Sequence, residues 1–173
     1  MKVNLVEKEV LDPLAESSQE NILLNDIPSP IHQISFFDNT KPGADIILNL
    51  IKTRLKQMDV IESKKPAGAG ANKSQLEKAA EGDVSILALG DCGSCATWVI
   101  LDAIRLEKDG VPTLSICSHK FAPFASKLAQ AHGAPDLRIV EIAHPIAGLG
   151  QEKVKEKTNF IIPEIEKILY NSD

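Results

Sequence analysis

Apolar residues in this chain are arranged in two alternating patterns, short continuous runs and stretches with a period of three to four residues. The short runs, typical of buried strands, lie at 34–37, 60–61, 84–89, 113–117 and 137–142. The helical spacing, with ends marked by glycine or proline, occupies 42–55, 73–80, 96–108, 121–132 and 151–170. The sequence therefore predicts five strands that alternate with five helices.

This alternating order is typical of a parallel sheet that is covered by helices on both faces. We therefore expect an α/β fold, a three-layer doubly wound parallel sheet of about five strands, of the flavodoxin or Rossmann type. Right-handed crossover connections leave few arrangements, and the commonest strand order for five such units is 2-1-3-4-5.

Residues 1–32 differ from the rest of the chain. They contain Asp12-Pro13, Pro28 and Pro30 and show no sustained helical or strand period. We interpret them as an N-terminal extension or arm that could pack on a neighbouring subunit, and we expect the α/β domain to cover residues 33–173. Such an extension favours a homo- or hetero-oligomer.

The length and net charge of the chain indicate how many domains it has and which partners it can bind. A chain of 173 residues suits one domain, and its net charge of −5 argues against a nucleic-acid partner, which usually needs a basic face. The first residues, Met1 to Val10, are too charged for a signal peptide, and no apolar run approaches the length of about 18 residues that a membrane helix needs. We therefore expect a cytoplasmic protein without a membrane partner.

Polar residues follow each predicted strand at its carboxyl end. In doubly wound folds, ligands bind at this edge, close to the point where the strand order reverses. With the order 2-1-3-4-5, residues 39–41 and Cys92 face each other across that point. The candidate substrate-binding residues at this edge are Asn39, Thr40, Lys41, Lys65, Gly93, Ser94, Ser118 and His119.

The thiol pair in Cys92-Gly93-Ser94-Cys95 follows the clearest buried strand and opens a helix. The positive end of the helix dipole and its free N–H groups favour a thiolate there, with a pKa well below about 8.5. In a chain without an export signal, such a pair indicates redox, nucleophilic or metal chemistry. The candidate catalytic residues are Cys92, Cys95, Asp91 as a general base or helix cap, and His144, with His119 as an alternative proton carrier.

A zinc site is the competing chemical interpretation. Structural zinc needs four ligands, and this chain has one thiol pair with only Cys117, His119 or His144 as distant further ligands. Cys117 ends a predicted buried strand, which favours a role as a small hydrophobic residue. No phosphate-binding glycine motif of the classical nucleotide sites is present, and we expect neither a metal nor a cofactor.

The chain contains the short motifs F-D-N-T-K-P-G-A-D at 37–45, G-D-C-G-S-C at 90–95, L-E-K-D-G-V-P-T at 106–113, F-A-P at 121–123, and His144-Pro145 with Gly148. In this order and spacing they resemble the UGSC-motif (seleno)protein family over about residues 34–160. In that family the first position of U-G-S-C is selenocysteine or cysteine, which implies that Cys92 is the reactive atom and Cys95 its partner thiol. The motif is also loosely similar to selenoprotein subunits of glycine- and betaine-reductase type, which cleave a bond next to a carboxylate.

These observations favour a thiol-dependent enzyme, an oxidoreductase or a lyase. In this hypothesis Cys92 attacks a small anionic or carbonyl substrate and Cys95 resolves the adduct, which gives a reductive cleavage or an elimination. A thiol reductant or a partner subunit would restore the thiols. Two alternatives stay open: a non-redox cysteine-dependent lyase or isomerase, and a subunit or sulfur-relay partner without turnover of its own.

Overall fold

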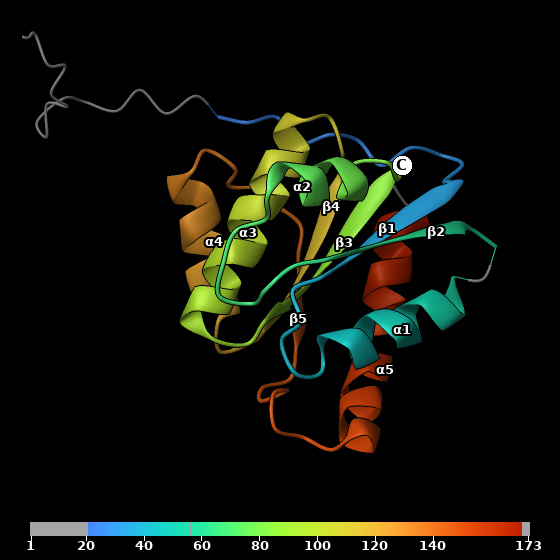
Figure 1. The fold of residues 1–173 in the computed structure, drawn as a ribbon, viewed down its shortest axis with the longest axis vertical. Coiled ribbons are helices and arrows are strands. Elements are labelled where there is room, and N and C mark those ends of the chain that lie inside the picture. Colours follow the sequence, from blue (N-terminus) through green and yellow to red (C-terminus); the bar gives the residue numbers. More distant parts are fainter. Residues whose placement is uncertain (1–20, 56, 171–173) are drawn as a thin grey trace, which may run out of the picture.

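The computed structural model describes residues 21–55 and 57–170 and contains one parallel sheet with helices on both faces (Figure 1). The strands are β1 (Gln33–Asp38), β2 (Asp59–Lys64), β3 (Val84–Gly90), β4 (Thr113–Ser118) and β5 (Ile139–Ile142). The helices are α1 (Ala44–Arg54), α2 (Lys73–Ala79), α3 (Gly93–Lys108), α4 (Ala122–Ala131) and α5 (Gln151–Tyr170).

The strand order is β2-β1-β3-β4-β5, with every neighbouring pair parallel. This confirms the predicted α/β class, the flavodoxin-like order and the five strands. The chain leaves β1 toward β2 on one side and later proceeds from β3 toward β5 on the other, so the order reverses between β1 and β3. The loops that follow these two strands therefore lead to helices on opposite faces of the sheet, α1 after β1 and α3 after β3. We call this switch point at the carboxyl edge of the sheet the opening.

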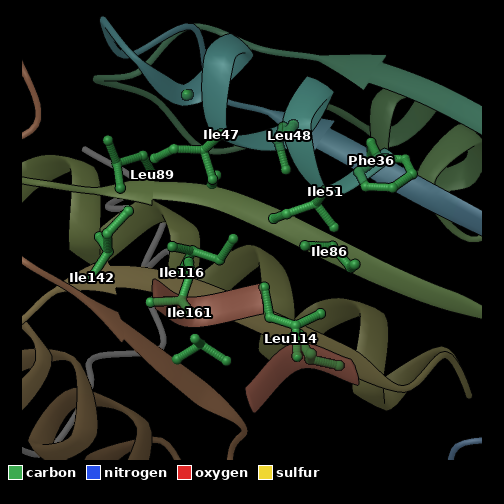
Figure 2. Packing of buried hydrophobic residues seen from close by; sticks show 14 of the residues in the cluster. Phe36, Ile47, Leu48, Ile51, Ile86, Leu89, Leu114, Ile116, Ile142 and Ile161 are labelled. Atoms are coloured by element: carbon green, nitrogen blue, oxygen red, sulfur yellow. The ribbon is translucent and has the colours of Figure 1, made fainter. Parts of the chain in front are cut away.

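Two hydrophobic layers hold the sheet, one on each face. Along β3, Ile86 and Ala88 pack with α1 and α5, whereas Leu87 lies on the opposite face with α3 and α4. Figure 2 shows the first layer, in which Ile47 and Ile51 of α1 lie against the strands. Because both faces are covered, all seven residues of β3 are buried, which explains its continuous apolar run in the sequence.

Two elements differ most in their bounds from the sequence prediction, β2 and α3. Strand β2 runs over six residues although only Val60 and Ile61 are apolar, because it is an edge strand whose side chains alternate between the core and solvent. Helix α3 begins at Gly93 rather than Ala96, because the Cys92 sulfur caps it by accepting the Cys95 N–H at 3.4 Å.

The described part of the predicted arm packs on its own domain rather than extending away from it. Residues 21–32 form no helix or strand, but Ile27 is buried in the core. The Asn25 side chain donates to the backbone carbonyl and the carboxylate of Glu107 at 2.6 and 2.9 Å, and the backbone carbonyl of Asn25 accepts from Arg138. Residues 1–20 of the arm lie outside the described residues. Within the described ranges, no helix is long and apolar enough to cross a membrane.

Candidate active site

The opening between β1 and β3 brings Lys41 and Cys92 together. The Nζ of Lys41 lies 3.7 Å from the Cys92 sulfur, although the two residues are 51 positions apart in the chain. Both side chains are partly exposed. Of residues 39–41, which were predicted to face Cys92, Lys41 makes this contact, and it places a cation beside the first thiol.

Cys92 and Cys95 are joined to each other in a disulfide, with their Cα atoms 5.3 Å apart. Cys92 is partly exposed at the N-cap of α3, whereas Cys95 is buried one turn further along the helix. Ser94 is exposed, and its Oγ lies 3.6 Å from the Cys92 sulfur. A ligand can therefore reach the Cys92 sulfur, whereas the buried Cys95 sulfur is in contact with Cys92.

Two glycines shape the turn around the thiols. A Cβ on Gly90 would lie 3.2 Å from the Cα of Ala96 and against the Cys117 sulfur, so α3 packs on the end of β3 only because residue 90 has no side chain. The sequence analysis missed this residue, and its only signal is a glycine that ends a buried strand. At Gly93 a Cβ would meet open space, which leaves the start of α3 accessible to a ligand.

Asp91 fixes the position of His144. One carboxylate oxygen lies 2.8 Å from His144 Nδ1, and the other accepts the N–H groups of Ile146 and Ala147 at 3.0 and 2.8 Å. Burial by itself would raise the pKa of Asp91, but these bonds and one from Ser118 outweigh burial and lower it. Asp91 therefore stays ionised and anchors the loop after β5, a role that depends on backbone groups the sequence analysis did not consider.

His144 is held on several sides. Its ring meets those of His119 and Phe121 edge to face, with centroids 6.3 and 5.7 Å apart. The buried Ser118 places its Oγ 3.2 Å from His144 Nδ1. Lys157 of α5 donates to the carbonyls of the two residues that flank His144, at 3.1 and 2.9 Å. This lysine was also missed, because nothing distinguishes it from the other lysines of a long polar helix.

Asn39 is buried, and its polar atoms are used inside the protein. Its side chain bonds both backbone groups of Leu89 at 2.9 and 2.8 Å, and its oxygen also accepts the N–H of Lys41. It thus ties the end of β1 to the end of β3 and positions Lys41, whereas we expected it to bind substrate. Thr40 is exposed with a positive φ of 55°, and its hydroxyl donates to the Lys65 carbonyl.

Lys65 does not face the opening, which corrects its expected place among the substrate contacts. Its Nζ lies 2.7 Å from a carboxylate oxygen of Asp102 on α3 and donates to the Ala69 carbonyl at 2.8 Å. Both charged side chains are almost fully buried, at 2% and 0% exposure. Burial lowers the pKa of Lys65 and the Asp102 carboxylate opposes that shift, so this pair anchors the loop before α2 on α3.

Cys117, the third cysteine, is fully buried and free. Burial raises the pKa of its thiol to about 12, so it stays protonated and packs as a hydrophobic residue, in agreement with the sequence analysis. Among the described residues, no three His, Cys, Asp or Glu side chains are grouped so that they could hold a metal ion.

A separate hollow of about 210 Å³ lies beside α1, β1 and β2, and its lining contains none of the candidate catalytic or substrate-binding residues. Its lining includes the carboxylates of Asp38, Asp45 and Glu62. Burial raises the pKa of Asp38, and Lys64, which also lines the hollow with its Nζ 3.9 Å from an Asp38 oxygen, opposes that shift. The three carboxylates outnumber this one lysine, so the lining disfavours an anionic ligand. The hollow is therefore a poor match to the substrate that the thiol site would take.

The model of the UGSC family matches residues 9–171 of this sequence. The chain belongs to the UGSC family. The match begins at residue 9, so it includes most of the segment that the motifs alone left outside the resemblance. No functionally curated protein matches the sequence.

Solved structures with similar folds have little sequence in common with this UGSC protein. A short-chain flavodoxin associated with a bacterial microcompartment is 11% identical, with 80% of this chain and 97% of that chain covered and a TM-score of 0.43. The lactose-specific IIB component domain of the Streptococcus pneumoniae phosphotransferase system is 12% identical, with 79% and 95% covered and a TM-score of 0.31. The Erwinia amylovora tyrosine phosphatase amsI is 13% identical, with 87% and 98% covered and a TM-score of 0.35.

Proposed function

We propose that this UGSC protein is a thiol-dependent enzyme in which Cys92 is the nucleophile and Cys95 the resolving thiol. The observation that carries the proposal is the position of Cys92 at the start of α3, partly exposed, with Lys41 Nζ at 3.7 Å and Cys95 within disulfide reach. After reduction of the disulfide, the cation and the helix N-terminus both favour the Cys92 thiolate.

The reaction that fits this arrangement is a reductive cleavage of a bond beside a carbonyl or carboxylate group. The Cys92 thiolate attacks the heteroatom group X of a substrate R–X, and the electrons of the R–X bond remain on carbon as an enolate. A proton held by His144 completes R–H, and Cys95 then attacks the Cys92 sulfur and releases HX. One R–X and two thiols give R–H, HX and a disulfide, which an external dithiol reductant returns to two thiols.

The charges around the opening suit an anionic or carbonyl substrate. Lys41 contributes a positive charge, and the carboxylate of Asp91 is occupied by His144 and two backbone N–H groups. A substrate carboxylate would therefore meet the lysine and the start of α3 rather than a free negative charge. A reductant protein or partner subunit would need to approach this same edge, where Gly93 and Ser94 are exposed.

The division of work between the two thiols can be tested with an aromatic disulfide such as dithionitrobenzoate on the reduced protein. Wild type should release two aryl thiolates per protein and keep no adduct, because Cys95 displaces the second one. Cys95→Ser should release one and retain a mixed disulfide at Cys92, and Cys117→Ser should behave as wild type. A stable adduct on wild type would refute the role of Cys95 as the resolving thiol. Rapid reaction of the Cys92→Ser variant would refute the role of Cys92 as the nucleophile.

The Asp91–His144 pair, whose Asp91 directly precedes Cys92 in the chain, supports one alternative, a lyase or isomerase in which Cys92 acts without a change of redox state. Such an enzyme would not need Cys95 as a thiol. Once a substrate is in hand, turnover by Cys95→Ser without any added reductant would favour this alternative. Loss of multiple turnover in that variant would favour reductive cleavage.

A further inference from the structure

The two histidines at the carboxyl edge use the same ring atom to hold their positions. His119 follows β4 and His144 follows β5, and their rings meet at an interplanar angle of 82°. In each ring Nδ1 is hydrogen-bonded inside the protein. Neither Nε2 atom has a hydrogen bond to any of the described residues. The Nε2 atoms are therefore the ones left for a ligand.

The partner of His144 fixes where its proton lies. Asp91 accepts two backbone N–H groups, and an ionised carboxylate can only accept hydrogen bonds. The His144 Nδ1 that lies 2.8 Å from this carboxylate must therefore carry a hydrogen. In the neutral ring the lone pair then lies on Nε2, which makes that atom the basic one.

The partner of His119 imposes the opposite arrangement. The backbone N–H of His144 lies 2.9 Å from His119 Nδ1, and a backbone N–H can only donate. Nδ1 of His119 must therefore carry the lone pair, so the neutral ring has its hydrogen on Nε2. The basic atom of His119, Nδ1, is therefore occupied by the backbone N–H, and its Nε2 is a hydrogen-bond donor without a partner among the described residues.

We propose that the two histidines present opposite Nε2 atoms to one substrate, His119 as a hydrogen-bond donor and His144 as the proton carrier. Their ring centroids lie 6.3 Å apart, so a single small molecule can span both. This assignment rests on the proposed function and specifies which substrate atom each ring meets. His119 binds an acceptor oxygen next to the reacting carbon, as in a ketone, a 2-oxo acid or a carboxylic acid derivative, and His144 faces that carbon.

The two roles complete the cleavage step without another group. The His119 N–H bonds the substrate oxygen and stabilises the negative charge that develops there as the C–X bond breaks. The protonated Nε2 of His144 gives its hydrogen to the carbon, whose electron pair becomes the new C–H bond, and the ring returns to the neutral form. Asp91 stabilises the imidazolium before this transfer and holds the ring in the matching tautomer.

Acylation by diethyl pyrocarbonate separates this arrangement from simple accessibility, because the reagent attacks an unprotonated ring nitrogen. His119 is exposed, whereas the His144 side chain is only 30% exposed, so accessibility alone would make His119 react first. We expect the reverse order, with His144 modified several-fold faster at slightly alkaline pH. The exposed His32 and His132 serve as internal references. Modification of His119 at the rate of these references, ahead of His144, would overturn the proposal.

Nitrogen NMR of uniformly labelled protein reads the tautomers directly, with His119→Gln and His144→Gln used to assign the signals. We expect His144 in the Nδ1–H form and His119 in the Nε2–H form at the same pH. The same tautomer in both rings would overturn the proposal. Because neither measurement depends on the thiols, this failure is distinguishable from a failure of the aryl disulfide test, which concerns Cys92 and Cys95 alone.

Discussion

Replacing Lys41 by methionine should slow the reaction of Cys92 by removing the nearest positive charge. At the 3.7 Å between Nζ and sulfur, two unit charges attract by about 1.1 kcal/mol in bulk water and about 4.5 kcal/mol at an effective dielectric constant of 20. Both side chains are partly exposed, so the value should lie near the lower limit. About 1.4 kcal/mol corresponds to one pH unit in the equilibrium between thiol and thiolate.

The assay is the rate of Cys92 alkylation by iodoacetamide as a function of pH, followed by mass spectrometry. Both proteins carry Cys95→Ser, which prevents disulfide formation. We expect the midpoint of the reference protein to lie below the value of about 8.5 for a free cysteine, and that of Lys41→Met to lie about one pH unit higher. Raising the salt concentration to about 1 M should narrow this difference, because it shortens the screening length to about 3 Å.

The matched control is Lys73→Met, which makes the same change in net charge at a side chain that is 89% exposed on α2. It should leave the midpoint of alkylation unchanged. Equal midpoints for Lys41→Met and the reference protein would refute the electrostatic role of Lys41. A midpoint of the reference protein at or above about 8.5 would show that the start of α3 does not activate the thiol.

Three further predictions concern groups whose burial the structure defines. Lys65→Met should lower the free energy of unfolding by about 3 kcal/mol, because it leaves the Asp102 carboxylate buried without its main partner. The control Lys73→Met should change the free energy of unfolding by less than about 0.5 kcal/mol. Equal urea midpoints for the two variants would contradict this prediction. Cys117 should resist alkylation at pH 8 until urea unfolds the protein, and labelling at the rate of Cys92 would show that it is not buried. Because the pKa of Asp91 is lower in the folded state than the value of about 3.9 in the unfolded state, ionised Asp91 stabilises the fold above that unfolded pKa. This contribution is lost as the pH falls through the folded pKa. Between about pH 5 and 2, Asp91→Asn should therefore lose less free energy of unfolding than wild type.

Local features of the sequence were sufficient to predict the elements and the position of the thiol pair. A continuous apolar run such as 84–89 predicts a strand buried on both faces, and strands that alternate with helices leave few parallel arrangements. Cys92 could be placed at the start of a helix because the thiol pair directly follows that strand. Membership of the UGSC family was likewise visible in the order of its short motifs.

The roles of several polar residues could not be predicted in this way. Asn39 and Lys65 both follow strands at the edge where ligands bind, yet each is occupied by a partner distant in the chain, Leu89 and Asp102 respectively. Asp91 could equally have been a base or a cap, and it is the approach of two backbone N–H groups after β5 that makes it an anchor for His144.

The sequence by itself determined the fold class and the position of the thiol pair at the carboxyl edge of the sheet. These follow from hydrophobic period and from residues adjacent in the chain, which are local properties. Only the tertiary structure decided which side chains remain free at that edge and which nitrogen of His119 and His144 carries a hydrogen. A hydrogen-bonding group joins whichever partner packing brings within about 3 Å, and packing depends on segments far apart in the chain.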